Sequence, residues 1–393
     1  MIYKLKDICI KVTDGSHFSP KAQEEGYPMF SVKDMLEYGF NYTSCKRISK
    51  QDFEKMQSSG CVPQEGDVLV AKDGSYLKEI FVCTETKNEA ILSSIAIFRP
   101  NQEIVNPYYL CYLLKSPQIY NYIASNCVSG SALPRIVLKD FKEVEMQVPD
   151  MSTQTKIVNI LKNIDGKIQN NYKINRNLQE QALAIYNDLF GNAKKESTID
   201  EVTINVTDGV HNTVKDDTDG EFYLLSCKNI KGGSFSLGAS ERRISRETFE
   251  KLRKRTKLEK GDILLSSVGT IGEILLLKFS PDQYEFQRSV AIIKPNSRMV
   301  SSVYLFFALL AQKQEIVHAA HGAVQQCLFI SDIKRFPIHK PQISLLKKFD
   351  DAVVPMMEMI YKNEEENKRI LELRDSLLPK LMSGELDVLD FDI

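Results

Sequence analysis

The stretch that decides the fold is Val12-Thr13-Asp14-Gly15-Ser16-His17, because it returns 194 positions later as Val206-Thr207-Asp208-Gly209-Val210-His211. Three further blocks return at offsets of 195 or 196 positions: Arg47 to Met56 as Arg243 to Leu252, Gly66 to Leu69 as Gly261 to Leu264, and Ser94 to Asn101 as Ser289 to Asn296. Blocks that recur in the same order and register indicate a tandem duplication. A repeat of this length is the size of a domain, which excludes a solenoid.

The first part of each repeat predicts a globular domain of mixed α and β structure. In the first repeat, Asp67 to Ala71 and Ile91 to Phe98 are apolar runs, which we interpret as buried strands. Gln51 to Met56 and Pro107 to Leu114 have the spacing of helices.

A long helix is predicted after each globular part. From Ser152 to about Phe190 the sequence has no proline, and only Gly166 interrupts it. Residues that step by three and four form a coiled-coil seam here, and the seam recurs 192 positions later. The first predicted seam is Ile157, Leu161, Ile164, Ile168, Asn171, Asn175, Leu178, Ala182, Ile185 and Leu189. The second is Phe349, Val353, Met356, Ile360, Asn363, Asn367, Ile370, Arg374, Leu377 and Leu381.

Each seam contains two asparagines at matching positions, which cost stability when buried but fix register and partner. An alternative is that each helix only packs on its own domain. A length of about 57 Å for 38 residues argues against this, because it exceeds the width of a small domain. Pro355 predicts that the second helix kinks there, or begins there after a shorter helical piece.

Two matching helices in one chain predict an intramolecular antiparallel coiled coil. The expected fold is therefore α+β, with two tandem mixed α/β domains separated by two long helices in a pseudo-twofold arrangement. We expect the domains at opposite ends of the coiled coil, at a fixed spacing. The predicted regions are a first domain at 1–150, a central helix at 151–191, a second domain at 192–342, and a C-terminal helix and tail at 343–393.

The composition is that of an ordinary soluble protein, with 43% hydrophobic residues, 26% charged residues and a net charge of −1. No apolar run is long enough for a membrane span, and the N-terminus has no signal-peptide pattern, so a cytoplasmic location is expected. The eight cysteines contain no Cys-x-x-Cys pair and the histidines do not cluster with them. We therefore expect no metal site, and buried thiols at positions such as Cys83 and Cys111.

Catalytic motifs are missing: the sequence has no phosphate loop, no Gly-x-Gly-x-x-Gly and no Gly-x-Ser-x-Gly. Asn106-Pro107-Tyr108-Tyr109 only loosely resembles the Asn-Pro-Pro-Tyr of adenine methyltransferases, and the other repeat has Ser301-Ser302-Val303-Tyr304. A proline in the first turn of a helix explains it better. The Asp-x-x-His pairs at Asp14 and Asp208 could serve acid–base chemistry. Because no nucleophile recurs beside them, a structural or DNA-contacting loop is favoured.

Basic residues cluster between Glu241 and Lys260, a stretch that contains nine Lys and Arg but four Glu. Such a cluster suits phosphate contacts, or is a solvated helix face. Replacing Arg253 and Arg255 with alanine is then expected to weaken DNA binding across sequences. Gly-containing loops at 72–75 and 267–270 follow a predicted strand in both repeats, and arginine or glutamine near 131–135 and 325–326 could read base edges. The candidate DNA-binding residues are Thr13, Asp14, Ser16, His17, Lys21, Lys46, Arg47, Lys72, Ser75, Ser131, Arg135, Thr207, Asp208, His211, Arg242, Arg243, Arg253, Lys254, Arg255, Ser267, Thr270, Gln325 and Gln326.

This order of features resembles the specificity subunit of Type I restriction–modification systems over essentially the whole chain. The resemblance is carried by the two Thr-Asp-Gly-x-His stretches, the two Gly-Asp strand starts, the junctions into the helices and the C-terminal ending. The residues concerned are Thr13–His17, Thr207–His211, Gly66-Asp67, Gly261-Asp262, Lys139–Phe141, Val148-Pro149, Gln154–Ile157, Ser331–Ile333, Lys340-Pro341 and Leu377–Leu386. One departure is the residues after the histidines, Phe18-Ser19-Pro20 against Asn212-Thr213-Val214, since the family often has proline there.

The resemblance implies that each domain reads one half of a bipartite target in double-stranded DNA, while the helices set the spacer between the halves. Two methyltransferase subunits would dock on the chain, and motor/endonuclease subunits would complete the complex. The chain itself would have no catalytic residue and no cofactor, because S-adenosylmethionine, ATP and magnesium would belong to those partners. The alternatives are a non-catalytic protein-binding scaffold and a single-chain DNA methyltransferase.

Overall fold

The computed structural model describes residues 1–388 except 131–133, 212–213, 236, 239–240 and 323–325. The chain divides into two compact units. Unit 1 consists of Met1–Gln169 and Asn367–Ile393, and unit 2 consists of Asn170–Glu366. The four regions predicted along the chain are therefore combined in space, because each unit takes a globular part and a portion of both long helices. In the part of the chain that the structure describes, no helix has the length and apolar character that a membrane span needs.

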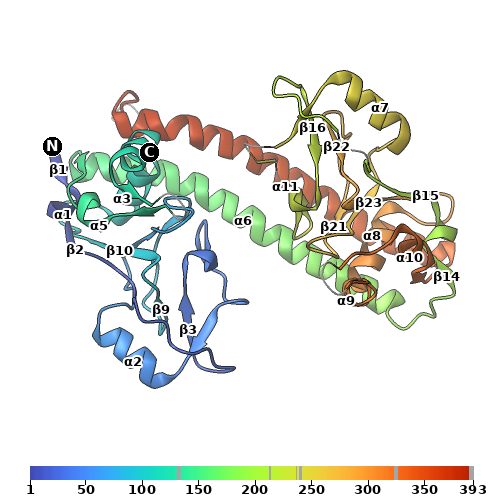
Figure 1. Cartoon of the computed structure of the whole chain (residues 1–393), viewed down its shortest axis with the longest axis horizontal. Helices are drawn as coiled ribbons and strands as arrows, with labels where there is room; N and C mark the ends of the chain where they lie inside the picture. The colour runs from blue at the N-terminus through green and yellow to red at the C-terminus, as the bar shows by residue number, and fades with distance from the viewer. Residues whose placement is uncertain (131–133, 212–213, 236, 239–240, 323–325, 389–393) are drawn as a thin grey trace. The chain divides into compact units, whose positions relative to one another are not determined.

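Unit 1 is built on an antiparallel four-stranded sheet in the order β2-β10-β7-β8, with a smaller sheet β6-β3-β9 beside it (Figure 1). Its strands are β1 (Ile2–Lys4), β2 (Cys9–Asp14), β3 (Tyr27–Phe30), β4 (Met35–Leu36), β5 (Gly39–Phe40), β6 (Lys46–Ile48), β7 (Val68–Ala71), β8 (Ile80–Val82), β9 (Ala90–Ile91), β10 (Ile95–Pro100), β11 (Val128–Ser129), β12 (Arg135–Ile136) and β13 (Glu145–Gln147). Its shorter helices are α1 (Leu5–Ile8), the 3-10 helix Val32–Asp34, α2 (Lys50–Ser58), α3 (Pro107–Lys115), α4 (Pro117–Asn126) and α5 (Leu138–Phe141). The predicted strand at Asp67 to Ala71 and both predicted helices are present. The predicted single strand Ile91 to Phe98 is wrong, because Ile91 ends β9 in the smaller sheet and β10 of the main sheet begins at Ile95.

The core of unit 1 lies on both faces of its main sheet. One face packs on α3, α5 and the long helices through side chains such as Phe98 and Phe141, whose rings meet edge to face. The other face packs around Phe30. Helix α3 begins as expected from its sequence: Pro107 occupies the first turn and the Asn106 side chain caps two backbone amides. The Asn-Pro-Tyr-Tyr stretch is therefore a helix start.

Unit 2 repeats this architecture with the sheet order β15-β23-β20-β21 and a smaller sheet β19-β16-β22. Its strands are β14 (Ser197–Thr198), β15 (Thr203–Asp208), β16 (Phe222–Leu225), β17 (Ile230–Lys231), β18 (Ser234–Phe235), β19 (Arg243–Ile244), β20 (Ile263–Ser266), β21 (Ile274–Leu276), β22 (Tyr284–Phe286), β23 (Val290–Pro295) and β24 (Pro337–Ile338). Its shorter helices are the 3-10 helices Asp200–Val202 and Cys227–Asn229, α7 (Arg246–Thr256), α8 (Ser302–Ala311), α9 (Lys313–His318) and α10 (Ile330–Arg335). The recurring sequence blocks therefore form equivalent strands and helices.

The two long helices are α6 (Met151–Phe190) and α11 (Ile343–Ser383), and they pack against each other in both units. In unit 2, Asn171 Nδ2 donates to Glu366 Oε2 at 2.8 Å, and Asn363 Nδ2 donates to Asn175 Oδ1 at 2.7 Å. In unit 1, Asn367 Nδ2 donates to the Ile168 carbonyl at 3.5 Å. Residue numbers rise along α6 as those of the α11 partners fall, so the pairing is antiparallel as predicted.

Every predicted seam side chain is buried or half-buried, including all four asparagines. Helix α11 continues through Pro355, so of the two alternatives at this proline the one in which the helix begins there is wrong. The helices also complete the cores of the globular parts, since Leu161 belongs to the core of unit 1 and Val353 to that of unit 2. The coiled coil and the packing of each helix on its own domain therefore coexist.

The helix pairing is ionic in unit 1 and apolar at the matching place in unit 2. In unit 1, Asp165 accepts hydrogen bonds from Tyr112 at 2.7 Å and Arg374 at 3.2 Å, and burial with this carboxylate raises the pKa of Tyr112. The matching residues of unit 2 are Met357, Phe307 and Ala182, which all belong to its apolar core.

The aspartate of each Gly-Asp strand start forms an internal ion pair, and this pair is present in both units. Asp67 accepts two hydrogen bonds from Arg99 at 2.8 Å each, and Asp262 accepts one from Lys294 at 2.7 Å. These aspartates are buried, so the motif belongs to the framework.

The prediction of buried thiols holds for five of the eight cysteines, and burial raises the pKa of Cys9 to about 12.

Candidate nucleic-acid interface

The two Thr-Asp-Gly-x-His stretches end equivalent strands in the same register. Asp14 pairs with Ala96 at the end of β2, and Asp208 pairs with Ala291 at the end of β15. The glycine that follows passes so close to the neighbouring strand that a side chain would not fit. A Cβ at Gly15 would lie 2.4 Å from the Ile91 carbonyl oxygen, and one at Gly209 would lie 2.0 Å from that of Phe286. Close backbone approach therefore explains the glycine of the Asp-Gly pair.

Each of these aspartates holds a histidine and a second cation. In unit 1, Asp14 lies 3.5 Å from His17 Nε2 and 2.7 Å from Lys72 Nζ. In unit 2, Asp208 lies 2.7 Å from His211 Nε2 and 3.0 Å from Arg255 Nη2. The histidine side chains are 79% and 56% exposed, whereas both carboxylates are largely covered. The histidine is thus an exposed group fixed to a covered anchor.

Two further segments lie next to the Asp-Gly-x-His loop in each unit. The loop at 72–75 leaves the buried strand β7 and forms a bridge between Asp73 and Arg135, and Gly74 N donates to the Pro134 carbonyl at 2.8 Å. The loop at 267–270 leaves β20 and forms the corresponding bridge between Val268 and Cys327. We call these three segments the loop edge of each unit: residues 14–17, 72–75 and 134–136 in unit 1, and residues 208–211, 267–270 and 326–328 in unit 2.

The loop edges have the same backbone contacts but different side chains. Lys72 N donates to the Ser94 carbonyl and Ser267 N to the Ser289 carbonyl, both at 2.9 Å, so the two residues are equivalent. Arg135 is replaced by Cys327 at the bridge. Ser75, Thr270, Arg135 and Gln326 are exposed, and Ser16 is half-buried. Ser131 and Gln325 lie outside the described residues.

One exposed cation next to the loop edge of unit 2, Arg288, was missed by the sequence predictions. Arg288 N donates to the Val210 carbonyl at 3.1 Å, and its equivalent in unit 1 is Ser93, which donates to the Ser16 carbonyl at 2.9 Å. The Arg288 side chain is exposed beside the loop of His211. The signal was available in the sequence, because this position differs between the repeats immediately before a recurring block.

The basic residues of β6, of β19 and immediately before β19 contact the segment that follows the histidine loop. Lys46 Nζ donates to Ser19 Oγ at 2.9 Å, and Arg47 donates to the Gly26 carbonyl at 3.1 Å. In unit 2, Arg243 makes the equivalent contact with Gly220 at 3.3 Å, and Arg242 donates to Asp216 at 2.6 Å. Three further candidate DNA-binding residues lie nearby along the chain. Lys21 is exposed, and Thr13 and Thr207 are half-buried in β2 and β15.

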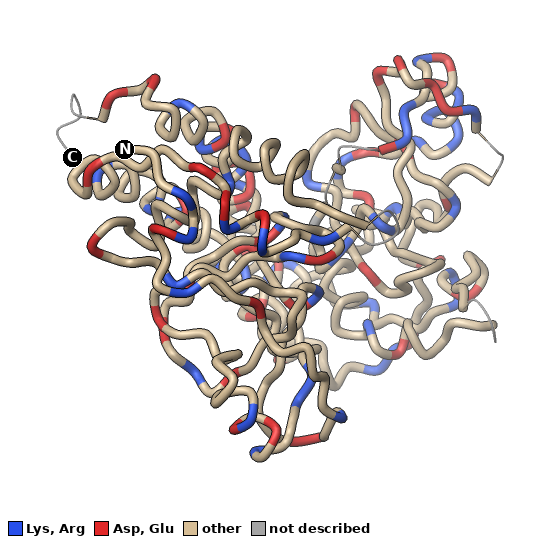
Figure 2. The backbone as a smooth tube through the Cα atoms, turned by 60° about the vertical axis from the view of Figure 1, so that its left-hand side comes forward, with Lys and Arg blue, Asp and Glu red and all other residues tan. Residues whose placement is uncertain are grey.

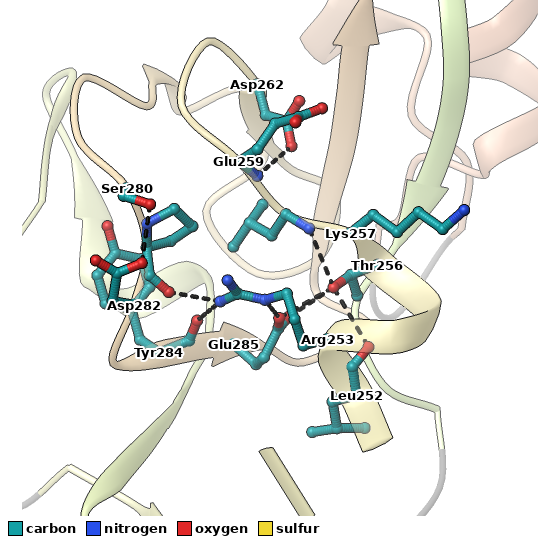
Figure 3. A network of polar contacts seen from close by, with 12 residues as sticks. Leu252, Arg253, Thr256, Lys257, Glu259, Asp262, Ser280, Asp282, Tyr284 and Glu285 are labelled. Atoms are coloured by element: carbon teal, nitrogen blue, oxygen red, sulfur yellow. Dashed lines mark hydrogen bonds and ion pairs between the residues drawn. The ribbon is translucent and has the colours of Figure 1, made fainter. Parts of the chain in front are cut away.

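The basic cluster around α7 divides into residues with internal contacts and residues that face solvent. Arg253 forms an ion pair with the buried carboxylate of Glu285 and donates to the carbonyls of Pro281 at 2.5 Å and Tyr284 at 3.0 Å (Figure 3). Burial raises the pKa of Glu285. Arg255 binds the loop of Asp208 although 43% of its side chain is exposed, and Lys254 is exposed as well. Arg253 and Arg255 thus have structural contacts, and Lys254 is the better placed for a phosphate.

The charges of the chain are mixed, with Lys and Arg interspersed among Asp and Glu along the backbone (Figure 2). Among the described residues, no group of three or more His, Cys, Asp and Glu side chains could hold a metal ion. The exposed side chains of the loop edges are hydrogen-bonding groups and single cations on a common backbone. Side chains of this kind can read the edges of bases.

Comparisons with known proteins concern the family and the fold. Residues 1–180 match the family described as the Type I restriction modification DNA specificity domain. The chain is 27% identical to the Type I restriction enzyme MjaIX specificity subunit of Methanocaldococcus jannaschii, over 98% of this chain and 93% of that protein. It is 21% identical to the Type I restriction enzyme HindI specificity subunit of Haemophilus influenzae, over 82% of this chain and 87% of that protein.

The fold is also similar to that of a solved structure, the S subunit of a Type-I restriction-modification system from M. genitalium. The TM-score is 0.55 at 15% sequence identity, over 97% of this chain and 95% of that chain. The predicted fold class, two mixed α/β domains with two long helices packed together, is confirmed. Residues 1–180 thus match the DNA specificity domain of Type I restriction–modification systems, and the chain is similar over 98% of its length to a specificity subunit of such a system.

Proposed function

We propose that this chain selects the DNA target of a Type I restriction–modification complex, and that each unit reads one half of a bipartite sequence. The observation that carries this proposal is the duplicated loop edge, in which equivalent backbone positions present different side chains. A shared framework with different exposed groups is what two different half-targets require, because base edges are told apart by hydrogen-bonding groups.

The base-reading residues would be the exposed ones. Arg135 in unit 1 suits guanine and Gln326 in unit 2 suits adenine, by the usual bidentate geometry of these side chains. The exposed histidines His17 and His211 lie beside them on the loop edges. Lys254 and Arg288 are the proposed phosphate contacts of unit 2, where they would supply affinity without sequence preference.

The remaining parts of the proposal concern the complex. The long helices would set the spacer between the half-targets and dock two methyltransferase subunits, and motor/endonuclease subunits would join them. Methyl transfer and cleavage would take place in those partners, which would bind S-adenosylmethionine, ATP and magnesium. The chain would then be a non-catalytic subunit that acts on cellular DNA, which implies a location in the cytoplasm.

The deciding experiment is a genome-wide map of adenine methylation in the host, with and without this gene. We expect one bipartite motif to lose its methylation when the gene is deleted and to regain it on complementation. If no motif loses its methylation when the gene is deleted, the proposal is contradicted. Methyl transfer by the purified chain alone, with S-adenosylmethionine and target DNA, would favour a single-chain methyltransferase. DNA affinity without any salt dependence would favour a scaffold.

A further inference from the structure

The aspartate of each loop edge is held by a cation that comes from a different element in each unit. In unit 1 the cation is Lys72, at the end of β7, whose Nζ lies 2.7 Å from Asp14 Oδ2. In unit 2 it is Arg255, in the last turn of α7, whose Nη2 lies 3.0 Å from Asp208 Oδ1. The same contact has therefore been built in two ways on one framework.

Neither cation has a counterpart of its own kind in the other unit. The residue equivalent to Lys72 is Ser267, which makes the matching backbone hydrogen bond. The turn of unit 1 that corresponds to Arg255 is the end of α2, where Ser58 closes the helix and Ser59 follows it. Each unit thus supplies one cation to its aspartate from the position where the other unit has serine.

Both cations are placed to fix the loop itself. The side chain of Lys72 is 9% exposed and that of Asp14 is 16% exposed, so water screens their attraction weakly. Arg255 Nη2 also donates to the backbone carbonyls of Asp208 at 2.8 Å and Gly209 at 2.7 Å. Within the described part of each unit, losing the cation would leave a largely covered carboxylate with the exposed histidine as its one remaining cationic partner.

We propose that Lys72 and Arg255 are positioning residues, each of which fixes the Asp-Gly-x-His loop of its own unit and thereby the reading of one half of the DNA target. This inference rests on the proposed function. Neither side chain needs to touch DNA, because each acts through the aspartate and the histidine that this aspartate holds. The two positions are interchangeable in principle, since the carboxylate needs one cation from either element.

The test compares discrimination against changes in each half of the target. The probes are the duplex identified by methylation mapping and two duplexes in which one half is scrambled, and the protein is the full chain in its complex. We expect Arg255→Ala to reduce discrimination at one half by about tenfold or more, while discrimination at the other half stays unchanged. Lys72→Ala should give the reverse pattern.

A transplanted cation separates positioning from a general loss of structure. Arg255→Ala combined with Ser267→Lys gives unit 2 the arrangement of unit 1, and we expect it to recover most of the lost discrimination. Lys72→Ala combined with Ser59→Arg is the reciprocal variant. Arg298→Ala is the matched control, because it removes an exposed arginine of the same unit outside the loop edge.

Each outcome decides the proposal. Equal losses at both halves, unchanged discrimination, or no recovery in a transplanted variant with a wild-type melting temperature would overturn it. If Arg255→Ala fails to fold, Arg255→Lys replaces it, and retained half-specific discrimination in that variant supports the proposal, while its loss contradicts it. Wild-type complex that does not discriminate between the three duplexes would instead refute the proposed function.

Discussion

Asn363 of α11 donates a hydrogen bond from Nδ2 to Oδ1 of Asn175 of α6 at 2.7 Å, within the seam of unit 2. We expect Asn175→Leu alone to cost about 1–3 kcal/mol, because it leaves the Asn363 amide buried without this acceptor. The double variant Asn175→Leu/Asn363→Leu should recover most of this loss. Urea unfolding of the purified chain measures both changes. Additive losses in the double variant would show that the two amides act independently.

Removing Arg374 tests the ionic pairing of the helices in unit 1. Arg374→Ala leaves the carboxylate of Asp165 buried without its cation, and we expect a cost of about 3–5 kcal/mol. The triple variant Asp165→Met/Arg374→Ala/Tyr112→Phe copies the apolar arrangement of unit 2 and should be close to the wild type in stability. Thermal unfolding checks this, and a triple variant as unstable as Arg374→Ala would disprove the equivalence of the two arrangements.

Arg253 should affect stability more than DNA binding. Arg253→Ala leaves the buried carboxylate of Glu285 unpaired by a cation, and we expect about 3–5 kcal/mol less stability in unit 2. The variant Arg253→Gln/Glu285→Ala copies the residues of unit 1, Gln57 and Ala90, and should recover stability. Lys254→Ala is the contrasting variant: we expect unchanged melting and a salt slope of DNA binding lower by about one. A lower salt slope for Arg253→Gln/Glu285→Ala would restore Arg253 as a phosphate contact.

The glycines of the loop edges and of α6 should respond in opposite directions to alanine. Gly209→Ala forces a Cβ against the Phe286 carbonyl, so we expect lower stability and weaker target discrimination. Gly166→Ala meets no atom within 4 Å and lies inside a helix, so it should gain about 0.5–1 kcal/mol. Melting temperatures of the two variants measure this contrast. A stabilised Gly209→Ala protein would mean that the loop does not depend on close backbone approach.

The fold could be predicted from the sequence because the chain contains the sequence pattern of each element twice. Blocks such as Gly66 to Leu69 and Gly261 to Leu264 recur in register, and the helical seams show the same spacing twice. The start of α3 at Pro107 also follows from local chemistry, since proline suits the first turn of a helix. These signals depend on residues that are neighbours along the chain.

The contacts of the candidate site could not be predicted in the same way. A count of charges between Glu241 and Lys260 cannot reveal that Arg253 binds Glu285, which is 32 positions away and buried in an apolar strand. Comparing the repeats position by position also fails for the loop aspartates. Their cations, Lys72 and Arg255, stand at positions that are not equivalent, and only the folded structure brings each one to its carboxylate.

Unit 1 is formed by two separate segments of the chain, and this affects the order in which the two units can fold. Its core includes Leu378, Leu381 and Val388, whereas unit 2 is one continuous segment from Asn170 to Glu366. At a synthesis rate of about 5–20 residues per second, residues 1–169 leave the ribosome roughly 10–40 s before those side chains exist. Unit 2 can complete its core as soon as it is translated, and the half of the protein that is synthesised first is the last to be finished.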